Sequence, residues 1–494
     1  MDAASDITGA RDLKELTTDF NTNVEYLKES LGVKKSFDVI HRELEFAGVR
    51  MGLFFVDGFV KDDVLNVIFI HLAKLEFKDL NPSAVSKLLH THIAYVETET
   101  VKDTEKIIAA VLAGPPVLLI EGSDTAIMID ARTYPARNPD EPDIERVVRG
   151  SRDGFTETLI FNTALTRRRL RDRSLRMEYL QIGRRSKTDI ALAYLEDVAD
   201  EQLVDTIRSK LQAVEVEGLA MADKTIEEFL FKRHWNPFPM VRYTERPDVA
   251  AIHLMEGHVL IYTDTSPSVM ITPTTLFHHV QHAEEYRQKP IVGAYLRWVR
   301  FAAMLASVFV LPLWLLIAVN PANVPDDLRF LLPKGEHEVP FLLQALLTEI
   351  GIDALRMAAI HTPNALATAL GLIAALMIGE IAVDVGLLTK NIILFLSISA
   401  LGTFATPSYE FGMATRIVRL SLLVLTGFFH GIGLIAGTLF WFLLLAFTKS
   451  LNTPYLWPLL PFNGKALLDI IVRSPVPAKH KRPSVLQPKD GSRT

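Results

Sequence analysis

Apolar residues are concentrated in the last two-fifths of the chain, in runs long enough to cross a membrane. The longest runs cover residues 303–319, 364–388, 391–409 and 420–448. A membrane-spanning helix needs about 20 mostly apolar residues. A further segment, 339–360, is apolar on one side and polar on the other. The pattern predicts an all-α polytopic membrane domain, which we place at residues 294–472.

Basic residues beside these runs predict the topology, because positive charge collects on the cytoplasmic side. If segment 339–360 crosses, and 420–448 bends at His430 to cross twice, the chain has six membrane segments and both termini are cytosolic. The alternative is one long tilted span over 420–448. The six-segment topology is favoured because it places all four flanking arginines on the cytoplasmic side: Arg297, Arg300, Arg416 and Arg419.

The charge-rich first part of the chain alternates strand-like and helix-like stretches. Residues 48–60 predict a strand with a turn at Asp57-Gly58, and 115–132 predict a hairpin. Residues 187–260 predict a strand, a helix over 199–213, and an end that reads strand, glycine turn, strand. The expected fold class is therefore a mixed α/β two-part cytosolic head followed by the membrane domain. The expected domains are a helical extension (1–35), two α/β subdomains (36–180 and 181–293), the membrane domain (294–472) and a basic cytosolic tail (473–494).

Carboxylates inside the run 364–388 are the main candidate functional groups. A charge at membrane depth costs at least a few kcal/mol, so it usually faces a protein interior or a watery path. In a ring of identical subunits, one helical stripe at spacing four would place an apolar constriction beside a ring of acids, as in a cation pore. The alternative is an ion pair within the bundle, for example with Arg356. The stripe contains Thr368, Leu372, Leu376, Glu380 and Asp384.

Two neighbouring sets of residues have predicted supporting roles. Small residues at spacing four let helices approach closely in lipid; these are Ala367, Gly371, Ala375 and Gly379. On one face of segment 339–360, three charged residues either line a vestibule or neutralise one another through an i,i+3 pair of the last two. These are Glu349, Asp353 and Arg356.

The composition of the chain and its lack of known motifs argue against several classes of function. The chain has no cysteine, so disulfides, thiol catalysis and cysteine-ligated metals are excluded. Its net charge of -6 gives no indication of nucleic-acid binding. The acidic N-terminus lacks the features of a signal peptide. No phosphate-binding loop, nucleophile elbow or dinucleotide fingerprint is present. We therefore expect neither an enzyme nor a cofactor.

Two polar clusters have competing interpretations. Six arginines between residues 167 and 176 bind either anionic lipid headgroups or local acids, and local acids are favoured; they are Arg167, Arg168, Arg169, Arg171, Arg173 and Arg176. His278 and His282 have the i,i+4 spacing of metal ligands, but no third ligand is evident. A polar connecting helix over 275–293 is the favoured interpretation, without a metal site.

Three long blocks resemble the GerA-type A subunits, the large subunits of spore germinant receptors in endospore-forming bacteria. They are ERVVRGSRDGFTETLIFNTALTRRRLRD, NPFPMVRYTERPDVAAIHLMEGHV and KSLNTPYLWPLLPF. The similarity spans about residues 40–465. Blocks such as RMAAIHTPNALATALGLIAALMIGEIAVDVGLL and TFATPSYE are closer to the stage V sporulation branch of this family. The stretches DTSPS (264–268) and EEYR (284–287) depart from the receptor pattern and argue against a nutrient-binding receptor.

This resemblance implies a subunit of an oligomeric channel in the spore inner membrane. The implied channel is a homo-oligomeric ring, a pentamer by resemblance, that passes monovalent cations, amplifies germination and has a small membrane partner subunit. The alternative is a non-conducting scaffold or accessory subunit of the dipicolinic acid transport or germinant receptor machinery. A single-subunit transporter is disfavoured because residues 294–472 show no matching halves.

Overall fold

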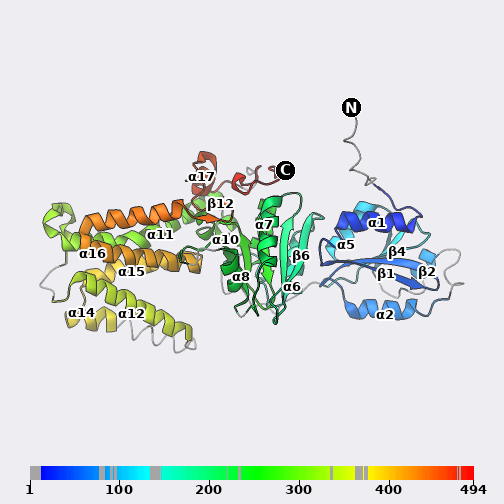
Figure 1. Cartoon of the computed structure of the whole chain (residues 1–494), viewed down its shortest axis with the longest axis horizontal. Coiled ribbons are helices and arrows are strands. Elements are labelled where there is room, and N and C mark those ends of the chain that lie inside the picture. Colours follow the sequence, from blue (N-terminus) through cyan, green and yellow to red (C-terminus); the bar gives the residue numbers. More distant parts are fainter. Residues whose placement is uncertain are drawn as a thin grey trace. The chain divides into compact units, whose positions relative to one another are not determined.

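The computed structural model divides the chain into two compact units (Figure 1). The α/β unit comprises Met1–Lys232, Tyr243–Pro273 and Lys479–Thr494, and the helical unit comprises Arg233–Arg242 and Thr274–Ala478. The structure describes residues 13–76, 84–89, 93, 97–133, 145, 147–219, 221–231, 235–333, 338–361, 371, 377–475, 477 and 480–493.

The first module of the α/β unit is an antiparallel sheet between helices, in the strand order β1-β2-β4-β5-β3. Alternate residues of a strand face opposite sides. Phe54 and Val56 accordingly pack with helices α1 and α5, while Met51 and Leu53 pack with α2. The strands are β1 (Val39–Phe46), β2 (Val49–Val56), β3 (Thr98–Val101), β4 (Val117–Ile120) and β5 (Ala126–Ile129); the helices are α1 (Phe20–Leu31), α2 (Asp62–Leu72), α4 (Ala84–Lys87) and α5 (Thr104–Ala113).

The second module repeats this topology, with the strand order β6-β7-β9-β10-β8. Each module therefore runs hairpin, helical segment, strand, helix, hairpin. Helices α6 and α9 pack on each other and on β7 and β9. The strands are β6 (Leu175–Ile182), β7 (Thr188–Leu195), β8 (Arg242–Thr244), β9 (Val259–Thr263) and β10 (Val269–Thr272); the helices are α6 (Leu159–Arg169), α7 (Glu201–Gln212), α8 (Ala222–Leu230) and α9 (Pro247–Glu256).

Most local predictions for this unit are confirmed. The strand predicted within residues 48–60 is β2, and the hairpin predicted for 115–132 is formed by β4 and β5. The strand predicted after residue 187 is β7, and the helix predicted for 199–213 is α7. One local prediction is wrong, because Gly257 does not join two strands. It ends helix α9 with a φ of 101° and leads into β9. The helix begins at Pro247, a residue that suits the first turn of a helix.

The C-terminal tail lies on the second module. The backbone N–H of Lys489 donates to Val198 O at 2.9 Å. The guanidinium of Arg482 donates to Met255 O at 2.8 Å, from Nε. Near the end of the chain, Arg493 forms an ion pair with Glu256 at 2.6 Å. The basic residues of the tail are thus partly used in fixing it to α9.

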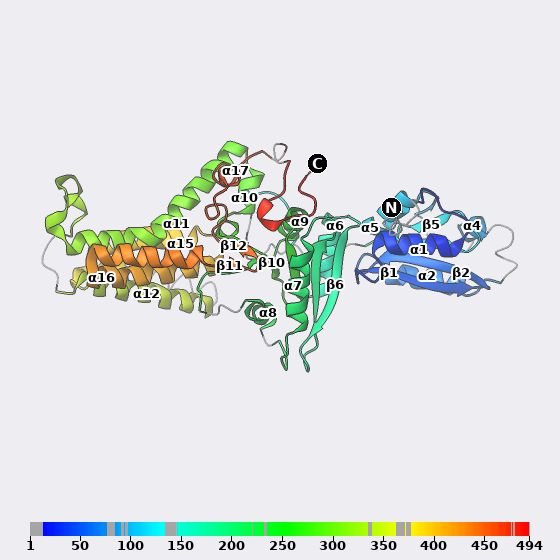
Figure 2. The same ribbon diagram turned by 45° about the horizontal axis from the view of Figure 1, so that its top comes forward.

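The helical unit contains two described helices that are long and apolar enough to cross a membrane, α11 (Pro290–Val319) and α16 (Tyr409–Ala446). They pack with α12 (Phe341–His361) and the shorter apolar α15 (Lys390–Phe404), as Figure 2 shows. The apolar side chains of the four helices meet around Trp314. The smaller elements are η2 (Leu276–His279), α10 (Ala283–Arg287), η3 (Pro321–Asn323), η4 (Asp326–Leu331), η5 (Met377–Ile381), α14 (Ala382–Asp384), β11 (Lys449–Ser450), β12 (Thr453–Pro454), α17 (Gly464–Ile471) and, in the tail, η7 (Ser484–Leu486).

Contacts at the two ends of the helices fix their directions. Gly402, near the end of α15, lies against Ala303 O of α11, while Asn391, at the start of α15, donates to Leu331 O beyond the end of α11. The two helices are therefore antiparallel. The backbone N–H of Thr389 donates to Gln344 Oε1 in the first turn of α12. The chain thus leaves α12 at one end of the bundle and enters α15 at the other.

Helix α16 is a helical hairpin. His430 has φ 53° and ψ -134°, which no α-helix contains. Beyond it the chain turns back, because Trp441 Nε1 donates to Ser421 Oγ at 2.7 Å. In one straight helix these residues, 20 apart in sequence, would be separated by about 30 Å. The predicted bend at His430 is confirmed, and residues 409–429 and 431–446 form two antiparallel limbs.

The hairpin gives a matched pair of glycine substitutions. At Gly433 an added Cβ would lie 2.0 Å from Leu425 O, whereas at Gly431 the nearest atom, of Leu316, is 4.0 Å away. We expect Gly433→Ala to lower the free energy of unfolding by about 1–3 kcal/mol through overpacking. Gly431→Ala should stay within about 1 kcal/mol of the wild type. Thermal unfolding of the full chain in detergent measures both, and equal effects would contradict the close approach of the limbs.

Candidate functional site: charges buried among the apolar helices

Helix α12 and the first limb of α16 present charged side chains to each other. The two run antiparallel, so Glu349 meets Arg419 and Asp353 meets Arg416 one turn further on. Arg419 holds Glu349 with two bonds, Nε to Oε1 at 2.6 Å and Nη2 to Oε2 at 3.0 Å. Arg416 Nη1 lies 2.8 Å from Asp353 Oδ1. The side chains of Glu349 and Arg419 are each 1% exposed, so this bidentate pair is fully desolvated.

The remaining donors of the two arginines tie four helices together. Arg419 Nη1 donates to Ser307 O of α11 at 2.6 Å and to Thr403 Oγ1 of α15 at 3.3 Å. Arg416 Nη2 donates to the backbone oxygen of Glu349 at 2.9 Å. A buried ion pair needs such additional hydrogen bonds to offset its desolvation. We name these three residues, Glu349, Arg416 and Arg419, the buried charge cluster.

The i,i+3 pair considered for Asp353 and Arg356 is not the pair that the structure shows, because Arg416 binds this carboxylate from the neighbouring helix. The guanidinium of Arg356 lies 4.9 Å from the ring centroid of Tyr409 and 5.5 Å from that of Phe404. Such cation–π contacts suit a partly desolvated arginine. A cavity of about 10 Å³ lies here, which is at most the size of one water. Glu349 faces arginines rather than open space.

The positions of Arg416 and Arg419 correct the sequence-based topology argument. Both were expected to flank an apolar segment on the cytoplasmic side, but both lie inside α16 and at most 5% of either side chain is exposed. A hydropathy profile could not show this, because their counter-charges are on α12. The available signal was the spacing: two acids four residues apart on one segment match two arginines three residues apart on another.

The carboxylates of the predicted pore stripe are exposed in this chain. Glu380 lies in the π-helical turn η5 and Asp384 ends α14. Among the described residues, neither forms an ion pair. The rest of the stripe, Thr368, Leu372 and Leu376, lies outside the described residues, as do Ala367 and Ala375. At Gly371 and Gly379 an added Cβ would meet no described atom within 4 Å. Their packing role therefore stays a prediction.

A second buried carboxylate, Glu285, holds the start of α11. Its Oε2 accepts from Arg297 Nε at 2.7 Å, and its Oε1 pairs with Arg300. Arg297 Nη1 also donates to Ile470 O at 2.7 Å, near the end of α17. The guanidinium groups of Arg297 and Arg473 lie 5.7 and 5.5 Å from the Tyr286 ring centroid. The two arginines that predicted the orientation of the first span are thus engaged by this acid.

The predicted connecting helix over 275–293 is interrupted, and its histidines cap short helices. His278 Nδ1 accepts from the backbone N–H of Thr275 at 2.9 Å, at the start of η2. His282 Nδ1 accepts from the N–H of Glu284 at 3.2 Å, at the start of α10. Between them, burial lowers the pKa of His279 to about 3. The i,i+4 spacing does not place His278 and His282 on one helix, so it gives no metal pair.

The arginine cluster is largely paired with local acids. Arg167 is fully buried between the two α/β modules, and its Nε donates to Asp38 Oδ2 at 2.9 Å. Its other donors reach Ser36 Oγ and Leu175 O, both at 3.1 Å. These contacts support the local interpretation over lipid headgroups. The further pairs are Arg169 with Asp153, Arg173 with Glu105 and Arg176 with Glu196.

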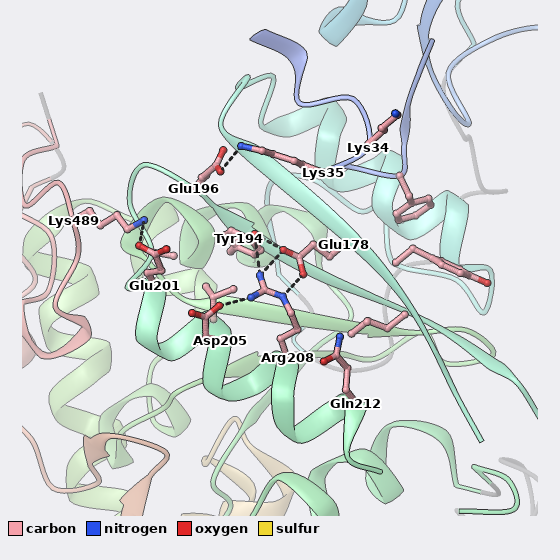
Figure 3. A pocket seen from close by; sticks show the side chains of 15 residues that line it. Lys34, Lys35, Glu178, Tyr194, Glu196, Glu201, Asp205, Arg208, Gln212 and Lys489 are labelled. Atoms are coloured by element: carbon pink, nitrogen blue, oxygen red, sulfur yellow. Dashed lines mark hydrogen bonds and ion pairs between the residues drawn. The ribbon is translucent and has the colours of Figure 1, made fainter. Parts of the chain in front are cut away.

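A cavity of about 560 Å³ opens beside β6 and α7 in the α/β unit (Figure 3). Arg208 lines the cavity, and its guanidinium donates to the Glu178 carboxylate, from Nε at 2.7 Å and from Nη2 at 2.6 Å. The bond to Glu178 raises the pKa of Arg208, and burial together with the same carboxylate raises that of Tyr194. On the rim, Lys35 pairs with Glu196. These charges neutralise one another, so the cavity has no clear preference for a charged ligand.

Comparisons with known proteins agree with the resemblance in the sequence. The family model described as Bacillus/Clostridium GerA spore germination protein matches residues 25–485. The chain is 48% identical over 468 residues to stage V sporulation protein AF of Bacillus subtilis (strain 168), covering 95% of each. It is 26% identical to spore germination protein KA of the same organism, covering 95% of this chain and 87% of that one.

Among solved structures, the N-terminal domain of the A subunit of the Bacillus megaterium spore germinant receptor GerK3 aligns with a TM-score of 0.42. It is 22% identical and covers 53% of this chain and 98% of that one. The sequence comparisons alone decide the assignment, because the family model spans almost the whole chain. They also confirm the predicted similarity to the stage V sporulation branch. This chain therefore belongs to the GerA family of spore germination proteins.

Proposed function

We propose that the chain is a subunit of a homo-oligomeric membrane channel that passes monovalent cations and amplifies spore germination. In this proposal the helical unit crosses the spore inner membrane six times, with both termini on the core side. The antiparallel directions of α11 and α15, and the two limbs of α16, support that count. The ring is a pentamer by family resemblance, and a small membrane partner subunit associates with it.

The observation that carries the proposal is the exposure of Glu380 and Asp384. Both lie among exposed apolar side chains, including Ile381 at 48% and Val385 at 70%. A carboxylate that faces lipid inside the membrane is unfavourable by a few kcal/mol, so the face of the helix that bears it needs contact with water or with another subunit. A closed ring of identical subunits supplies both. The π-helical turn at Glu380 fits as well, because such turns are frequent at functional sites.

In this proposal the buried and the exposed charges of the helical unit have different roles. Glu349 forms ion pairs with Arg416 and Arg419 inside the bundle, so these charges hold the helices together instead of meeting ions. The exposed pair, Glu380 and Asp384, would concentrate cations at the ring axis. Leu372 and Leu376 would form the apolar constriction that closes the path by dewetting.

Ion flux in liposomes tests the proposal. The full chain is reconstituted as wild type and as Glu380→Gln/Asp384→Asn, and potassium efflux is followed with an indicator. We expect the double variant to reduce the flux about tenfold or to remove cation selectivity, since the ring loses its negative charge. The matched control is Asp327→Asn, an exposed carboxylate in η4, which should leave the flux unchanged.

The other outcomes decide between the remaining possibilities. Flux that is equal in the wild type and the double variant would keep the channel and reject the acidic stripe as its lining. No flux from folded wild-type protein, with or without the partner subunit, would reject the channel and favour a non-conducting scaffold.

A further inference from the structure

We infer that His253, Glu256 and His258 form a binding site for a divalent transition metal such as Zn²⁺. One donor atom from each residue lies within 4.8 Å of the donor atoms of the other two. Two imidazoles and one carboxylate are a donor set that suits zinc, with a fourth position left for water. The site lies in the second α/β module, within the α/β unit, and does not depend on the proposed channel.

Local backbone geometry brings the three residues together. His253 and Glu256 lie three residues apart in the last turn of α9, so they share one face of that helix. Gly257 then adopts φ 101°, and the backbone N–H of His258 donates to His253 O at 3.0 Å. This turn folds the chain back on the helix end. As a result, the two imidazole rings meet with their centroids 5.1 Å apart.

The surroundings favour the metal-binding form of the first histidine. His253 Nδ1 lies 2.8 Å from Val249 O, and a carbonyl only accepts, so the ring carries its proton on Nδ1. The lone pair is then on Nε2, as in many metal-ligating histidines that donate from Nδ1 to a backbone carbonyl. His258 is fully buried and His253 is 7% exposed. Low solvent exposure strengthens the attraction between a cation and a carboxylate.

The C-terminal tail competes for this site. Arg493 pairs with Glu256 at 2.6 Å, and both side chains are about one-fifth exposed, at 22% and 18%. A dication at Glu256 would repel the guanidinium, since both need the same carboxylate. Metal and Arg493 therefore compete for Glu256, and metal binding weakens this contact of the tail with α9.

Cobalt titration of the full chain in detergent tests the site. The protein is first treated with a chelator, and the visible absorption of Co²⁺ is followed, with Zn²⁺ added as a competitor. We expect saturable binding of one Co²⁺ per chain that Zn²⁺ displaces. His253→Gln, His258→Gln and Glu256→Gln should each weaken binding at least about 10- to 100-fold, because each removes a ligand and the loss of an outer-shell partner alone has an effect of that size. His71→Gln, an exposed histidine on α2, is the control and should bind like the wild type.

A second variant tests the competition and does not depend on the buried histidines folding normally. Arg493→Met should tighten Co²⁺ binding about two- to fivefold, which is the worth of a partly exposed ion pair. Wild-type affinity in all three glutamine variants, or no saturable binding by folded wild-type protein, would overturn the site. Unchanged or weaker binding by Arg493→Met would overturn the competition with the tail.

Discussion

Replacing Glu349 by glutamine is expected to lower the free energy of unfolding by about 3–5 kcal/mol. The substitution keeps the side-chain volume but leaves Arg416 and Arg419 buried without their shared counter-charge. Removing one partner of a buried ion pair is strongly unfavourable, because the remaining charge stays desolvated. Unfolding of the full chain in detergent, followed by heat or by denaturant, measures the change.

Two further variants test whether the unpaired charge causes the loss of stability in Glu349→Gln. Asp353→Asn removes a carboxylate from the same helix face, but the side chain of Asp353 is 30% exposed, so the loss should be about 1 kcal/mol or less. Glu349→Leu/Arg419→Met removes the bidentate pair as a whole and should recover most of the stability, as replacement of buried pairs by apolar residues often does. A loss for Glu349→Gln no larger than that for Asp353→Asn would contradict this account.

A loss of similar size is expected for Arg167→Met at the contact between the two α/β modules. The substitution leaves Asp38, 1% exposed in its side chain, without a counter-charge, and it removes donors to Ser36 and Leu175. We expect the free energy of unfolding to fall by about 3–5 kcal/mol. Hydrogen exchange of the full chain shows which part of the molecule is destabilised. Amides of β1 and β6 should lose protection before those of the helical unit.

The neighbouring Arg173→Met is the matched control. Its ion pair with Glu105 is more than half exposed on both sides, so its loss should be within about 1 kcal/mol of zero. A small effect at both positions would mean that the modules are held together by apolar contacts alone. A large effect at Arg173 only would reject the assignment of Arg167 as the central contact.

Local patterns in the sequence predicted the elements whose cause is local. The strand of β2, the β4–β5 hairpin and the bend at His430 follow from alternation, turn residues and the length of the apolar run. The prediction for Gly257 is wrong for the same reason, because a glycine after an apolar stretch is common both at the end of a helix and in the turn between two strands. The family assignment rested on long blocks and was confirmed.

The contacts that organise the molecule could not be predicted in this way. Arg419 and Glu349 are 70 residues apart in sequence, and Arg167 and Asp38 are 129 apart. Their pairing depends on the register of packed helices and modules, which no local pattern contains. For the metal site, the spacing of His253, Glu256 and His258 was visible, but only the helix end at Gly257 brings the three together.

The order of synthesis gives the buried charge cluster a further consequence. Chains emerge from the ribosome N-terminus first. Glu349 is therefore made 67 residues before Arg416 and 70 before Arg419. Until those residues arrive, α12 carries a carboxylate with no counter-charge, and its burial among apolar helices is unfavourable. Closing the bundle one helix at a time along the chain is therefore unfavourable. A nascent chain that stops before Arg416 leaves Glu349 of α12 without either of its arginines.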